Sequence, residues 1–285
     1  MSKTISYCEV TESERLAPDV FSMWLDAGDI AASAKAGQFV SLYPRDGAHL
    51  LPRPISICEI DENGGRLRLV YRIAGYGTDE FSRLSPGSIV KVMGPLGNGF
   101  PILENINKNR KNTILIGGGI GIPPMLSVAN DIRSLALDSE GCRITTVAGY
   151  RDRHTFLSDD LYELSDTFLT ATDDGSRGTH GTVIDALDEW FDPGVPFDVP
   201  VGSVSGASYV VYACGPVPML RGVKKWAADH GIAAWISMEE RMACGIGACL
   251  GCVCKSRDTD EHSRVNNKRV CADGPVFPAD EIDLG

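Results

Sequence analysis

The sequence lacks any stretch long and apolar enough to cross a membrane as a helix, and it lacks an export signal. A membrane-spanning helix needs roughly 18 or more consecutive apolar residues, and no run of the chain approaches that length. Residues Met1–Val10 contain neither a basic region nor the apolar core of a secretory signal. We therefore predict a cytoplasmic protein, in which the nine cysteines are reduced thiols or metal ligands rather than disulfides.

An excess of basic residues is missing as well. The chain has 38 Asp and Glu against 27 Lys and Arg, which gives a formal net charge of −11. Because nucleic-acid-binding surfaces are usually basic, this balance argues against such a surface. The length of 285 residues predicts about two domains, and the apolar fraction of 43% is that of an ordinary globular chain.

What the sequence does have is a group of cysteines near its C-terminal end. Cys244, Cys249 and Cys252 follow the spacing C-x4-C-x2-C, and Cys271 comes after 18 further residues. This is the plant-type ferredoxin spacing, in which four thiolates hold a 2Fe–2S cluster. Glycines between the cysteines allow backbone N–H groups to turn toward the cluster sulfurs. We therefore predict that these four cysteines are the ligands of a 2Fe–2S cluster.

Two other interpretations of the cysteines fit less well. A structural zinc site usually has two C-x2-C pairs or a mixture of Cys and His, which this spacing does not provide. A disulfide framework is typical of short secreted chains, and this chain is neither. Cys254 lies two residues beyond Cys252, where an extended segment would turn its side chain away, so it is not included among the ligands.

The hydrophobic pattern predicts three parts, namely residues 1–102, 103–237 and 238–285. In the first part, short β-rich runs separated by Gly, Pro and Asn predict a small antiparallel barrel. The predicted strands there cover residues 38–43, 54–60, 67–72 and 89–93. The polar stretch 104–112 is expected to be a linker.

In the second part, strands alternate with helices, which predicts a parallel sheet covered by helices. The predicted strands are 113–116, 144–150, 167–172, 209–213 and 233–237, and the predicted helices lie near 124–136, 158–164, 182–191 and 216–229. The Gly- and Pro-rich stretch 192–207 is expected to be a loop. Residues 238–285 form the cysteine module.

A glycine-rich turn follows the first strand of this sheet. Gly119, Gly121 and Pro124 stand between that strand and the next helix, where a backbone without side chains can approach a pyrophosphate. The same pattern also fits a purely structural strand–helix turn. Cys214 ends a later strand at the same edge of the sheet, and it could equally be a small buried residue.

Asp173 and Asp174 follow another strand of the sheet. Their carboxylates could accept hydrogen bonds from ribose hydroxyls, or they could cap the next turn. The two carboxylates would repel the 2′-phosphate of NADP, although several arginines, at 151, 153 and 177, lie close in sequence.

In the barrel, Arg53 and Arg72 place cations within otherwise apolar strands. A half-buried arginine needs an anionic partner, which a flavin pyrophosphate would supply. The glycine turn Gly75–Thr78 is a second possible phosphate cradle. Each arginine could instead be a solvated residue on the outer face of a strand.

Together these motifs resemble the ferredoxin-NADP reductase-like flavoproteins over nearly the whole chain. Residues 53–56 match the Arg-x-Tyr-Ser flavin motif of that superfamily, residues 119–124 its Gly-x-Gly-x-x-Pro turn, and residues 214–216 its Cys-Gly-x motif. The appended cysteine module is narrower in distribution. With it, the chain resembles the electron-transfer subunits of the NAD-dependent dihydroorotate dehydrogenases.

The resemblance implies an FAD-binding barrel, a Rossmann-like NAD domain and a C-terminal 2Fe–2S module. It places FAD contacts on Arg53, Pro54, Ile55 and Ser56, on Val70, Tyr71 and Arg72, and on Gly77 and Thr78; NAD contacts on Gly119, Gly121, Pro124, Asp173 and Cys214; and cluster ligands on Cys244, Cys249, Cys252 and Cys271. Ser56 would lie near the reactive edge of the flavin and Cys214 beside the nicotinamide. Ile55 departs from the motif, because many members have a tyrosine there that stacks on the flavin.

The same resemblance implies a relay in de novo pyrimidine (UMP) biosynthesis. A separate FMN-containing subunit oxidises dihydroorotate, and electrons pass through the 2Fe–2S cluster and FAD of this chain to NAD+. The expected assembly is a heterotetramer with two copies of each chain, and this chain is not expected to bind dihydroorotate. Three alternatives remain: a subunit of an NADH-dependent ferredoxin:NADP or sulfide-linked reductase, a stand-alone flavin reductase, and a zinc-stabilised adaptor. Relatives of the first kind tend to have an Asp in the cluster loop, where this chain has Cys.

Overall fold

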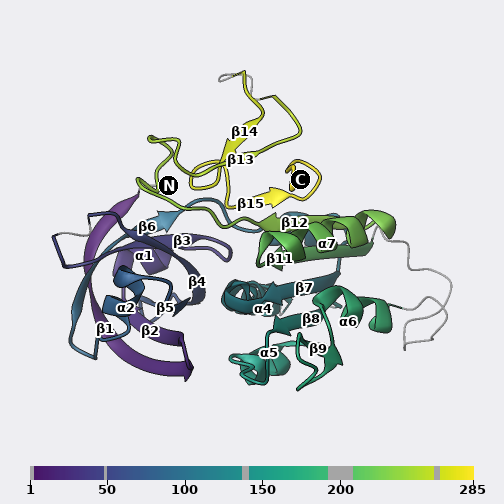
Figure 1. The fold of residues 1–285 in the computed structure, drawn as a ribbon, viewed down its shortest axis with the longest axis horizontal. Coiled ribbons are helices and arrows are strands. Elements are labelled where there is room, and N and C mark those ends of the chain that lie inside the picture. The colour runs from purple at the N-terminus through teal and green to yellow at the C-terminus, as the bar shows by residue number, and fades with distance from the viewer. Residues whose placement is uncertain (1–2, 48–49, 137–140, 192–207, 260–263) are drawn as a thin grey trace. The chain divides into compact units, whose positions relative to one another are not determined.

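The computed structural model describes residues 3–47, 50–136, 141–191, 208–259 and 264–285. Two compact units make up the chain. The first contains residues 1–100 and 238–276, and the second contains residues 101–237 and 277–285. The cysteine segment therefore belongs to the same unit as the N-terminal barrel (Figure 1). The expected three-part division, with boundaries after residues 102 and 237, stays a prediction.

The first unit is built on a closed antiparallel barrel. Its strands are β1 (Thr4–Ala17), β2 (Val20–Asp26), β3 (Phe39–Tyr43), β4 (Arg53–Asp61), β5 (Arg66–Arg72) and β6 (Ile89–Leu96), in the spatial order β1-β2-β5-β4-β3-β6. Two short helices, α1 (Gly28–Ser33) and α2 (Tyr76–Phe81), accompany the strands. The barrel predicted from the sequence is confirmed, and β1 and β2 complete it.

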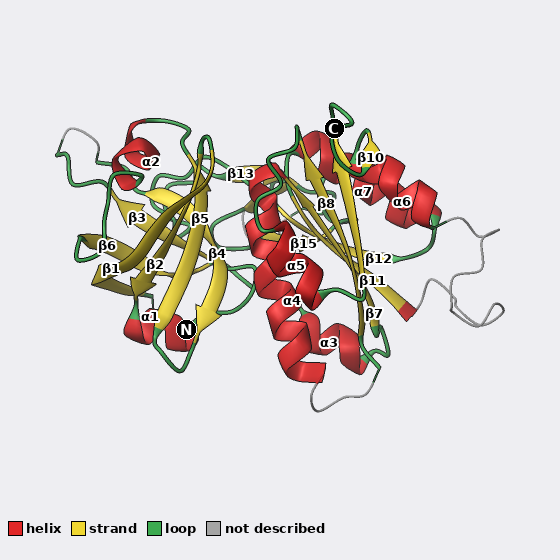
Figure 2. Cartoon of the chain, turned by 90° about the horizontal axis from the view of Figure 1, so that it is seen from below, coloured by secondary structure: helices red, strands yellow, loops and turns green. Residues whose placement is uncertain are grey.

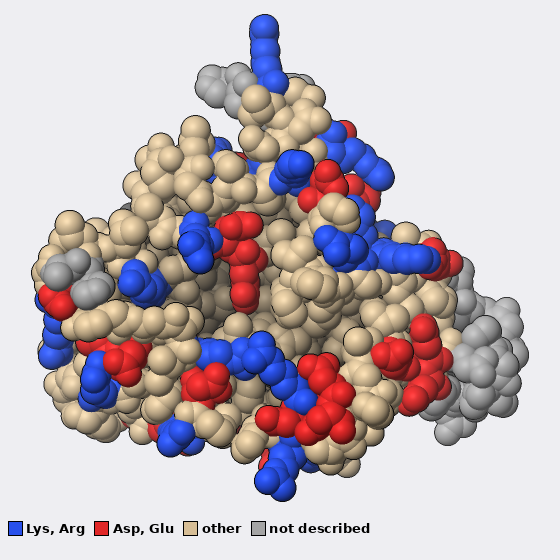
Figure 3. Space-filling view, in the orientation of Figure 1, with Lys and Arg blue, Asp and Glu red and all other residues tan. Residues whose placement is uncertain are grey.

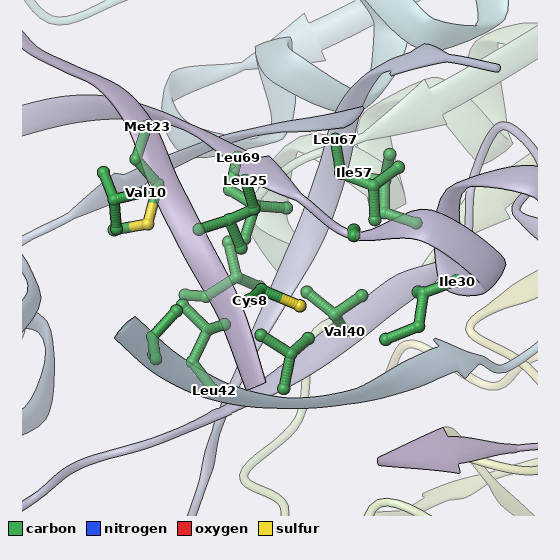
Figure 4. Close-up of a cluster of buried hydrophobic side chains, with 14 of the residues drawn as sticks. Cys8, Val10, Met23, Leu25, Ile30, Val40, Leu42, Ile57, Leu67 and Leu69 are labelled. Carbon is green, nitrogen blue, oxygen red and sulfur yellow. The ribbon is translucent and has the colours of Figure 1, made fainter. Parts of the chain in front are cut away.

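Alternation of side chains along the strands fills the barrel. On β1, Cys8 and Val10 point inward and are fully buried, whereas Tyr7 and Glu9, which alternate with them, are exposed. Successive side chains of a strand face opposite sides, so one face of every strand lines the core. Figure 4 shows aliphatic side chains from several strands meeting inside the barrel, with Leu67 and Leu69 of β5 among them.

The second unit is a parallel sheet with helices on both faces. The strands β7 (Asn112–Gly118), β8 (Arg143–Tyr150), β9 (Thr167–Thr172), β10 (Thr179–His180), β11 (Tyr209–Cys214), β12 (Ala233–Ser237) and β15 (Val276–Pro278) lie in the order β10-β9-β8-β7-β11-β12-β15. The helices are α3 (Ile102–Asn107), α4 (Ile122–Ala136), α5 (Ser158–Leu164), α6 (Val183–Trp190) and α7 (Val217–Asp229). Figure 2 shows α4 and α5 on one face of the sheet and α6 and α7 on the other.

The predicted order of strands and helices in this unit is confirmed, and the strands β7, β8, β9, β11 and β12 pair in parallel. The predicted linker at 104–112 is wrong, because α3 occupies its first half and β7 begins at its end. Asn105 explains the error. Its side chain is buried, donates to the Pro101 carbonyl at 2.9 Å and accepts from Arg110 at 2.7 Å, so a polar sequence packs here. The predicted loop 192–207 lies outside the described residues.

The cysteine segment of the first unit contains one small hairpin. The strands β13 (Val253–Lys255) and β14 (Asn267–Arg269) pair antiparallel, with Val253 opposite Arg269. Cys254 is buried on β13, and burial raises the pKa of its thiol to about 11. In the part of the chain that the structure describes, no helix is long and apolar enough to cross a membrane.

Candidate functional site

The hairpin brings the fourth cysteine to the other three. The backbone N–H of Val270 donates to the carbonyl of Cys252 at 2.9 Å, which continues the β13–β14 pairing by one step. The next N–H, that of Cys271, lies 3.4 Å from the Cys252 sulfur and donates to it. Residues that are far apart in sequence thus meet because a short strand pair aligns them.

The four thiols approach each other in two pairs. Cys244 is within hydrogen-bonding reach of the Cys249 thiol, and Cys271 is within reach of the Cys252 thiol. Among the residues with described positions, no three His, Cys, Asp or Glu side chains are grouped as ligands of a single metal ion. A 2Fe–2S cluster places two protein ligands on each of its irons, so paired thiols fit it better than they fit one tetrahedral zinc.

Each of the four sulfurs accepts a backbone N–H. Gly247 donates to Cys271 at 3.1 Å, Ile246 to Cys244 at 3.5 Å, Gly251 to Cys249 at 3.4 Å, and Cys271 to Cys252 at 3.4 Å. Hydrogen bonds of this kind stabilise thiolate charge and tune the potential of an iron–sulfur centre. The expectation that the loop glycines turn N–H groups toward the sulfurs is confirmed for Gly247 and Gly251.

Burial and hydrogen bonding act in opposite directions on the thiols. Burial opposes ionisation of Cys244, but N–H groups of the loop and the Cys249 thiol bond to its sulfur, and together they lower its pKa. Burial raises the pKa of Cys271, and the neighbouring Cys252 adds to the rise. The surroundings of Cys244 in the loop therefore favour its thiolate form, whereas the surroundings of Cys271 beside the hairpin oppose ionisation of its thiol.

An ion pair fastens the hairpin side to the loop. The guanidinium of Arg269 lies 2.7 and 3.0 Å from the two carboxylate oxygens of Asp273, and the Arg269 N–H donates to the same carboxylate at 2.8 Å. The guanidinium also donates to the Gly247 carbonyl at 3.4 Å. Arg269 thus joins the turn that carries Cys271 to the loop that carries Cys244.

The cysteine loop rests on the outer wall of the barrel. A Cβ built on Gly245 would lie 3.1 Å from the Ser41 Oγ, 3.3 Å from Leu96 and 3.5 Å from Met93. Ser41 is buried, and among the described residues its hydroxyl has no hydrogen-bond partner. A buried hydroxyl without a partner is uncommon in a finished core. This polar atom beside a ligand loop fits a site completed by a bound group.

In the barrel, the predicted flavin residues of β4 and of the α2 turn lie together. A Cβ on Gly77 would meet the Arg53 guanidinium at 2.9 Å, so the Arg53 side chain packs directly against the backbone of this turn. Thr78 holds the turn in shape, because its hydroxyl accepts the N–H groups of Ala74 at 2.8 Å and Gly75 at 3.2 Å. The turn and the arginine together place a positive charge beside a glycine-containing backbone turn, a combination that suits a phosphate group.

The remaining predicted flavin residues divide between the core and the outer face. Ile55 is buried with the aliphatic side chains of the barrel, and Ser56 next to it is only half-buried. Pro54 pairs with Ser41 across β3 and β4, and Val70 is buried. The Ile55 side chain belongs to the barrel core. This chain therefore has no aromatic ring at the position where the superfamily motif has a tyrosine.

Tyr71 and Arg72 carry buried polar atoms that the described residues leave without hydrogen bonds. Burial raises the pKa of Tyr71. Arg72 Nε lies 3.0 Å from a carboxylate oxygen of Asp19. The two groups form an ion pair, but the N–H does not point at the oxygen as a hydrogen bond requires. Glu239 keeps exposed surface, yet the protein packed around its carboxyl raises its pKa, and the charge of Arg72 opposes the rise.

In the second unit, the glycine-rich turn and Cys214 meet at one edge of the sheet. Cys214 pairs with Gly117 at the ends of β11 and β7, and a Cβ on Gly121 would lie 2.2 Å from the Cys214 carbonyl oxygen. Gly119 has a φ of 53°, and Pro124 lies in the first turn of α4. The order of strands reverses between β7 and β11, and ligands of open α/β sheets bind at such a reversal.

The two aspartates behave differently. Asp174 accepts the Ser176 N–H at 2.9 Å, and hydrogen bonds from Ser176 lower the pKa of this carboxyl. Asp174 therefore caps the turn after β9, as one of the two interpretations proposed. Asp173 is exposed and follows β9, which is separated from β7 by β8. Its part in binding a ribose stays a prediction. Cys214 is buried, with 1% of its surface exposed.

Several residues of the site have no signal in the sequence. Ser41 and Met93 are far from the cysteine motif in the chain, and only the folded barrel brings them to the cysteine loop. Glu239 precedes Cys244 by five residues but belongs to no motif. The Arg269–Asp273 pair lies beside Cys271 and has the helix-like spacing of four residues, which could have indicated an ion pair.

Comparison with protein families assigns both halves of this arrangement. Residues 239–283 match the iron–sulfur cluster binding domain of dihydroorotate dehydrogenase B. Residues 115–225 match an oxidoreductase NAD-binding domain.

Curated relatives extend over nearly the whole chain. It is 40% identical over 280 residues to the electron transfer subunit of dihydroorotate dehydrogenase B (NAD(+)) from Streptococcus pneumoniae strain R6, which covers 97% of each chain. It is 36% identical over 278 residues to the subunit of the same name from Bacillus mycoides, with 96% of this chain and 97% of that one covered.

Solved structures show the same fold. An NADH-dependent reduced ferredoxin-NADP oxidoreductase, studied for flavin-based electron bifurcation, superposes with a TM-score of 0.80 at 29% identity, over 98% of this chain and 90% of that one. A ferredoxin NADP+ reductase from Neisseria gonorrhoeae has a TM-score of 0.63 at 17% identity, over 83% of this chain and 94% of that one. The second likeness concerns the fold alone.

Proposed function

Because this chain belongs to the family of electron transfer subunits of the NAD-dependent dihydroorotate dehydrogenases, we propose that it carries electrons from an FMN-containing catalytic subunit to NAD+. A 2Fe–2S cluster and FAD are the carriers within the chain. The observation that supports this most is the arrangement of four thiols in two pairs, each sulfur with a backbone N–H donor. Cys244, Cys249, Cys252 and Cys271 would hold the cluster.

The barrel supplies the residues for FAD. Bound FAD accepts electrons singly from an iron–sulfur centre and exchanges a hydride with a nicotinamide. Arg53 and the turn around Gly77 would hold its pyrophosphate, because their charge and backbone N–H groups suit a phosphate. Arg72 would add a second positive charge, shared with Asp19 and Glu239. Ser56, half-buried on β4, would donate a hydrogen bond near the reacting edge of the flavin.

The edge of the sheet where the strand order reverses, between β7 and β11, supplies the residues for NAD. Gly119 and Gly121 would let the dinucleotide phosphates approach the start of α4, and Pro124 occupies a position in the helix where no N–H is needed. Cys214, at the end of β11, would border the nicotinamide. Asp173 would favour NAD over NADP because its negative charge repels a 2′-phosphate. Comparing steady-state rates with NADH and NADPH tests the preference, and a higher rate with NADPH would contradict it.

The partner is a dihydroorotate-oxidising subunit with its own FMN, assembled as two copies of each chain. We expect this oxidoreductase subunit not to bind dihydroorotate itself and to depend on its partner for the substrate. The closing experiment is anaerobic. The purified chain is mixed with the FMN-containing dihydroorotate dehydrogenase of the same organism, dihydroorotate and NAD+ are added, and NADH absorbance is followed. We expect NADH only when both chains are present.

Exchange of one ligand tests the route of the electrons. Cys249→Ser should keep flavin and NADH binding but lose transfer to the partner, whereas Cys254→Ser should transfer normally because Cys254 lies on β13, away from the thiol pairs. Full transfer by Cys249→Ser would contradict the relay. Turnover of NADH with free acceptors, without any effect of the partner, would instead indicate a stand-alone flavin reductase.

A second candidate is a subunit of an NADH-dependent ferredoxin:NADP reductase. The likeness to such a protein, with a TM-score of 0.80 at 29% identity, favours it. Against it, all four ligand positions are cysteines. NADH-dependent transfer of electrons between ferredoxin and NADP, together with no NADH formation from dihydroorotate, would move the assignment to this second function.

A further inference from the structure

One wall of the barrel carries a row of exposed apolar side chains. Ile5 and Tyr7 project outward from β1, and Tyr7 is 75% exposed. The register of β1 and β6 places Ile5 beside Met93 and Tyr7 beside Lys91. The row ends with the exposed Ile89, which lies beside the exposed Glu9. Single exposed apolar residues are ordinary, but these belong to adjacent positions on two paired strands.

The third strand of the same wall continues the row. The register of β3 and β6 places Tyr43 beside Lys91 and Ser41 beside Met93. The Lys91 ammonium lies 4.7 Å from the centre of the Tyr43 ring, and the Tyr43 hydroxyl contacts the Met93 sulfur at 3.7 Å. The positive charge of Lys91 is therefore held over an aromatic ring. Toward Ile89 the wall also carries Glu9 and Arg45, so the apolar and aromatic side chains have a charged border.

This wall is continuous with the cysteine loop. Gly245 rests on Ser41 and Met93 of the wall, and from there the loop exposes Ile246 and Leu250, the latter by 61%. Leu250 also has a left-handed φ of 57°, which is costly for a residue with a bulky side chain. In Figure 3, the segment leading into β13 has few charged side chains, whereas charged side chains of both signs lie below it, around β6 and over the barrel.

We propose that this surface, formed by Ile5, Tyr7, Ile89, Tyr43, Ile246 and Leu250, is where the FMN-containing catalytic subunit docks. This docking surface rests on the proposed function. Contiguous apolar surface on a folded chain marks an interaction site, and exposed tyrosines are frequent anchors of protein interfaces. Cys249, the exposed ligand, stands next to Leu250. A partner that covers Leu250 is therefore brought against the one thiol that faces outward.

A second copy of this chain is a poorer occupant. It would bring together two identical clusters, which neither supply nor remove electrons, whereas the catalytic subunit supplies them. The wall extends the contact beyond the cysteine loop, and a stable interface buries roughly 800 Å² per partner.

Charge introduced into this surface tests it, and the iron content of Leu250→Glu is measured as well because Leu250 lies between the predicted ligands Cys249 and Cys252. Tyr7→Glu and Leu250→Glu should each weaken binding of the FMN-containing subunit at least tenfold by isothermal titration calorimetry. Tyr162→Glu and Leu103→Glu are the matched controls, because these residues are 67% and 56% exposed on the second unit, and they should bind normally. Reduction of ferricyanide by NADH should be unchanged in Tyr7→Glu, which shows that its flavin is in place.

Hydrogen exchange of the wild-type pair provides evidence that does not depend on a variant folding. Residues 4–10, 88–93 and 246–253 should gain protection when the partner is added. Normal binding by both Tyr7→Glu and Leu250→Glu, or protection confined to other segments, would overturn the docking surface while leaving the function intact. Loss of self-association in Tyr7→Glu, with normal partner binding, would assign the surface to a second copy. A wild-type chain that binds no such subunit would overturn the proposed function and the surface together.

Discussion

A Cβ on Gly121 would lie 2.2 Å from the carbonyl oxygen of Cys214, closer than any real side-chain contact. The glycine-rich turn after β7 and the end of β11 are therefore in backbone contact, and each fixes the position of the other. Two motifs that lie 93 residues apart in the sequence, from 121 to 214, form one structural element.

Gly121→Ala tests this contact. Because the new methyl group must displace backbone rather than a flexible side chain, we expect the turn to shift and the affinity for NADH to fall by roughly tenfold, which corresponds to about 1.4 kcal/mol. Flavin and iron content should be unchanged. Stopped-flow reduction of the flavin by NADH measures the effect. Gly47→Ala, where a Cβ would meet nothing within 4 Å, is the control and should behave as wild type.

The cysteine loop has an equally narrow tolerance at Gly247. This residue has a φ of 86°, and a Cβ there would lie 2.7 Å from the Ala272 Cβ. In Gly247→Ala, backbone strain of about 1–2 kcal/mol adds to the collision. We expect the turn to shift, so that the backbone N–H of residue 247 no longer reaches the Cys271 sulfur. We expect most of the iron and sulfide to be missing after purification. Gly251→Ala, with its nearest contact at 3.4 Å, should retain much more, and equal iron content in both would contradict the prediction.

Thr78 determines the shape of the turn next to Arg53. Its buried hydroxyl accepts two backbone N–H groups, and Thr78→Val leaves both without an acceptor, at a cost of about 1–3 kcal/mol. We expect weaker retention of FAD, measured by fluorescence of released flavin during dialysis. Thr78→Ser restores the hydroxyl and should restore flavin binding. If the serine variant also loses flavin, the hydroxyl is not the cause.

The Arg269–Asp273 pair gives the first unit a defined pH dependence. Hydrogen bonds and the charge of Arg269 lower the pKa of Asp273 below 3.8. A carboxyl with a lowered folded pKa stabilises the fold above its unfolded pKa, and that contribution is lost as the pH falls through the folded value. Asp273→Asn should therefore cost roughly 0.5–1 kcal/mol near pH 7, with the difference from wild type shrinking below about pH 4.

Thermal unfolding of both proteins between pH 7 and pH 3 measures the difference. Asp280→Asn, a change at an exposed carboxyl in the second unit, should follow the wild-type curve throughout. A constant difference between Asp273→Asn and wild type at every pH would mean that the pair acts through packing rather than charge.

The strands and helices around the sheet were predictable because their periodicity is strong and their glycines stand at the ends of strands. The first half of residues 104–112 was not, since Asn105 looks like a loop residue until its amide is seen buried between Pro101 and Arg110. The four thiols were predictable from spacing alone. Their pairing depends on the β13–β14 register, which cannot be predicted from the sequence of three-residue strands.

The wall beneath the cysteine loop was equally invisible in the sequence. Ser41 and Met93 lie on strands that the hydrophobic pattern does predict, but which residues of a barrel wall meet a distant loop depends on long-range register. Tyr7 and Ile5 follow the alternation of β1, a strand that the pattern did not single out. Side chains that contact other parts of the chain only after folding carry no local signal.

The first unit is made of two segments, and residues 101–237 of the second unit lie between them in the sequence. During synthesis the barrel strands emerge early, but the segment that packs against Ser41, Met93 and Leu96 emerges only after the sheet of the second unit. The pairing of Gly245 with the wall is thus among the most non-local contacts in the chain, and contacts of this kind form slowly. A chain truncated within residues 101–237 would retain the barrel strands but none of the four cysteines predicted to hold the iron–sulfur centre.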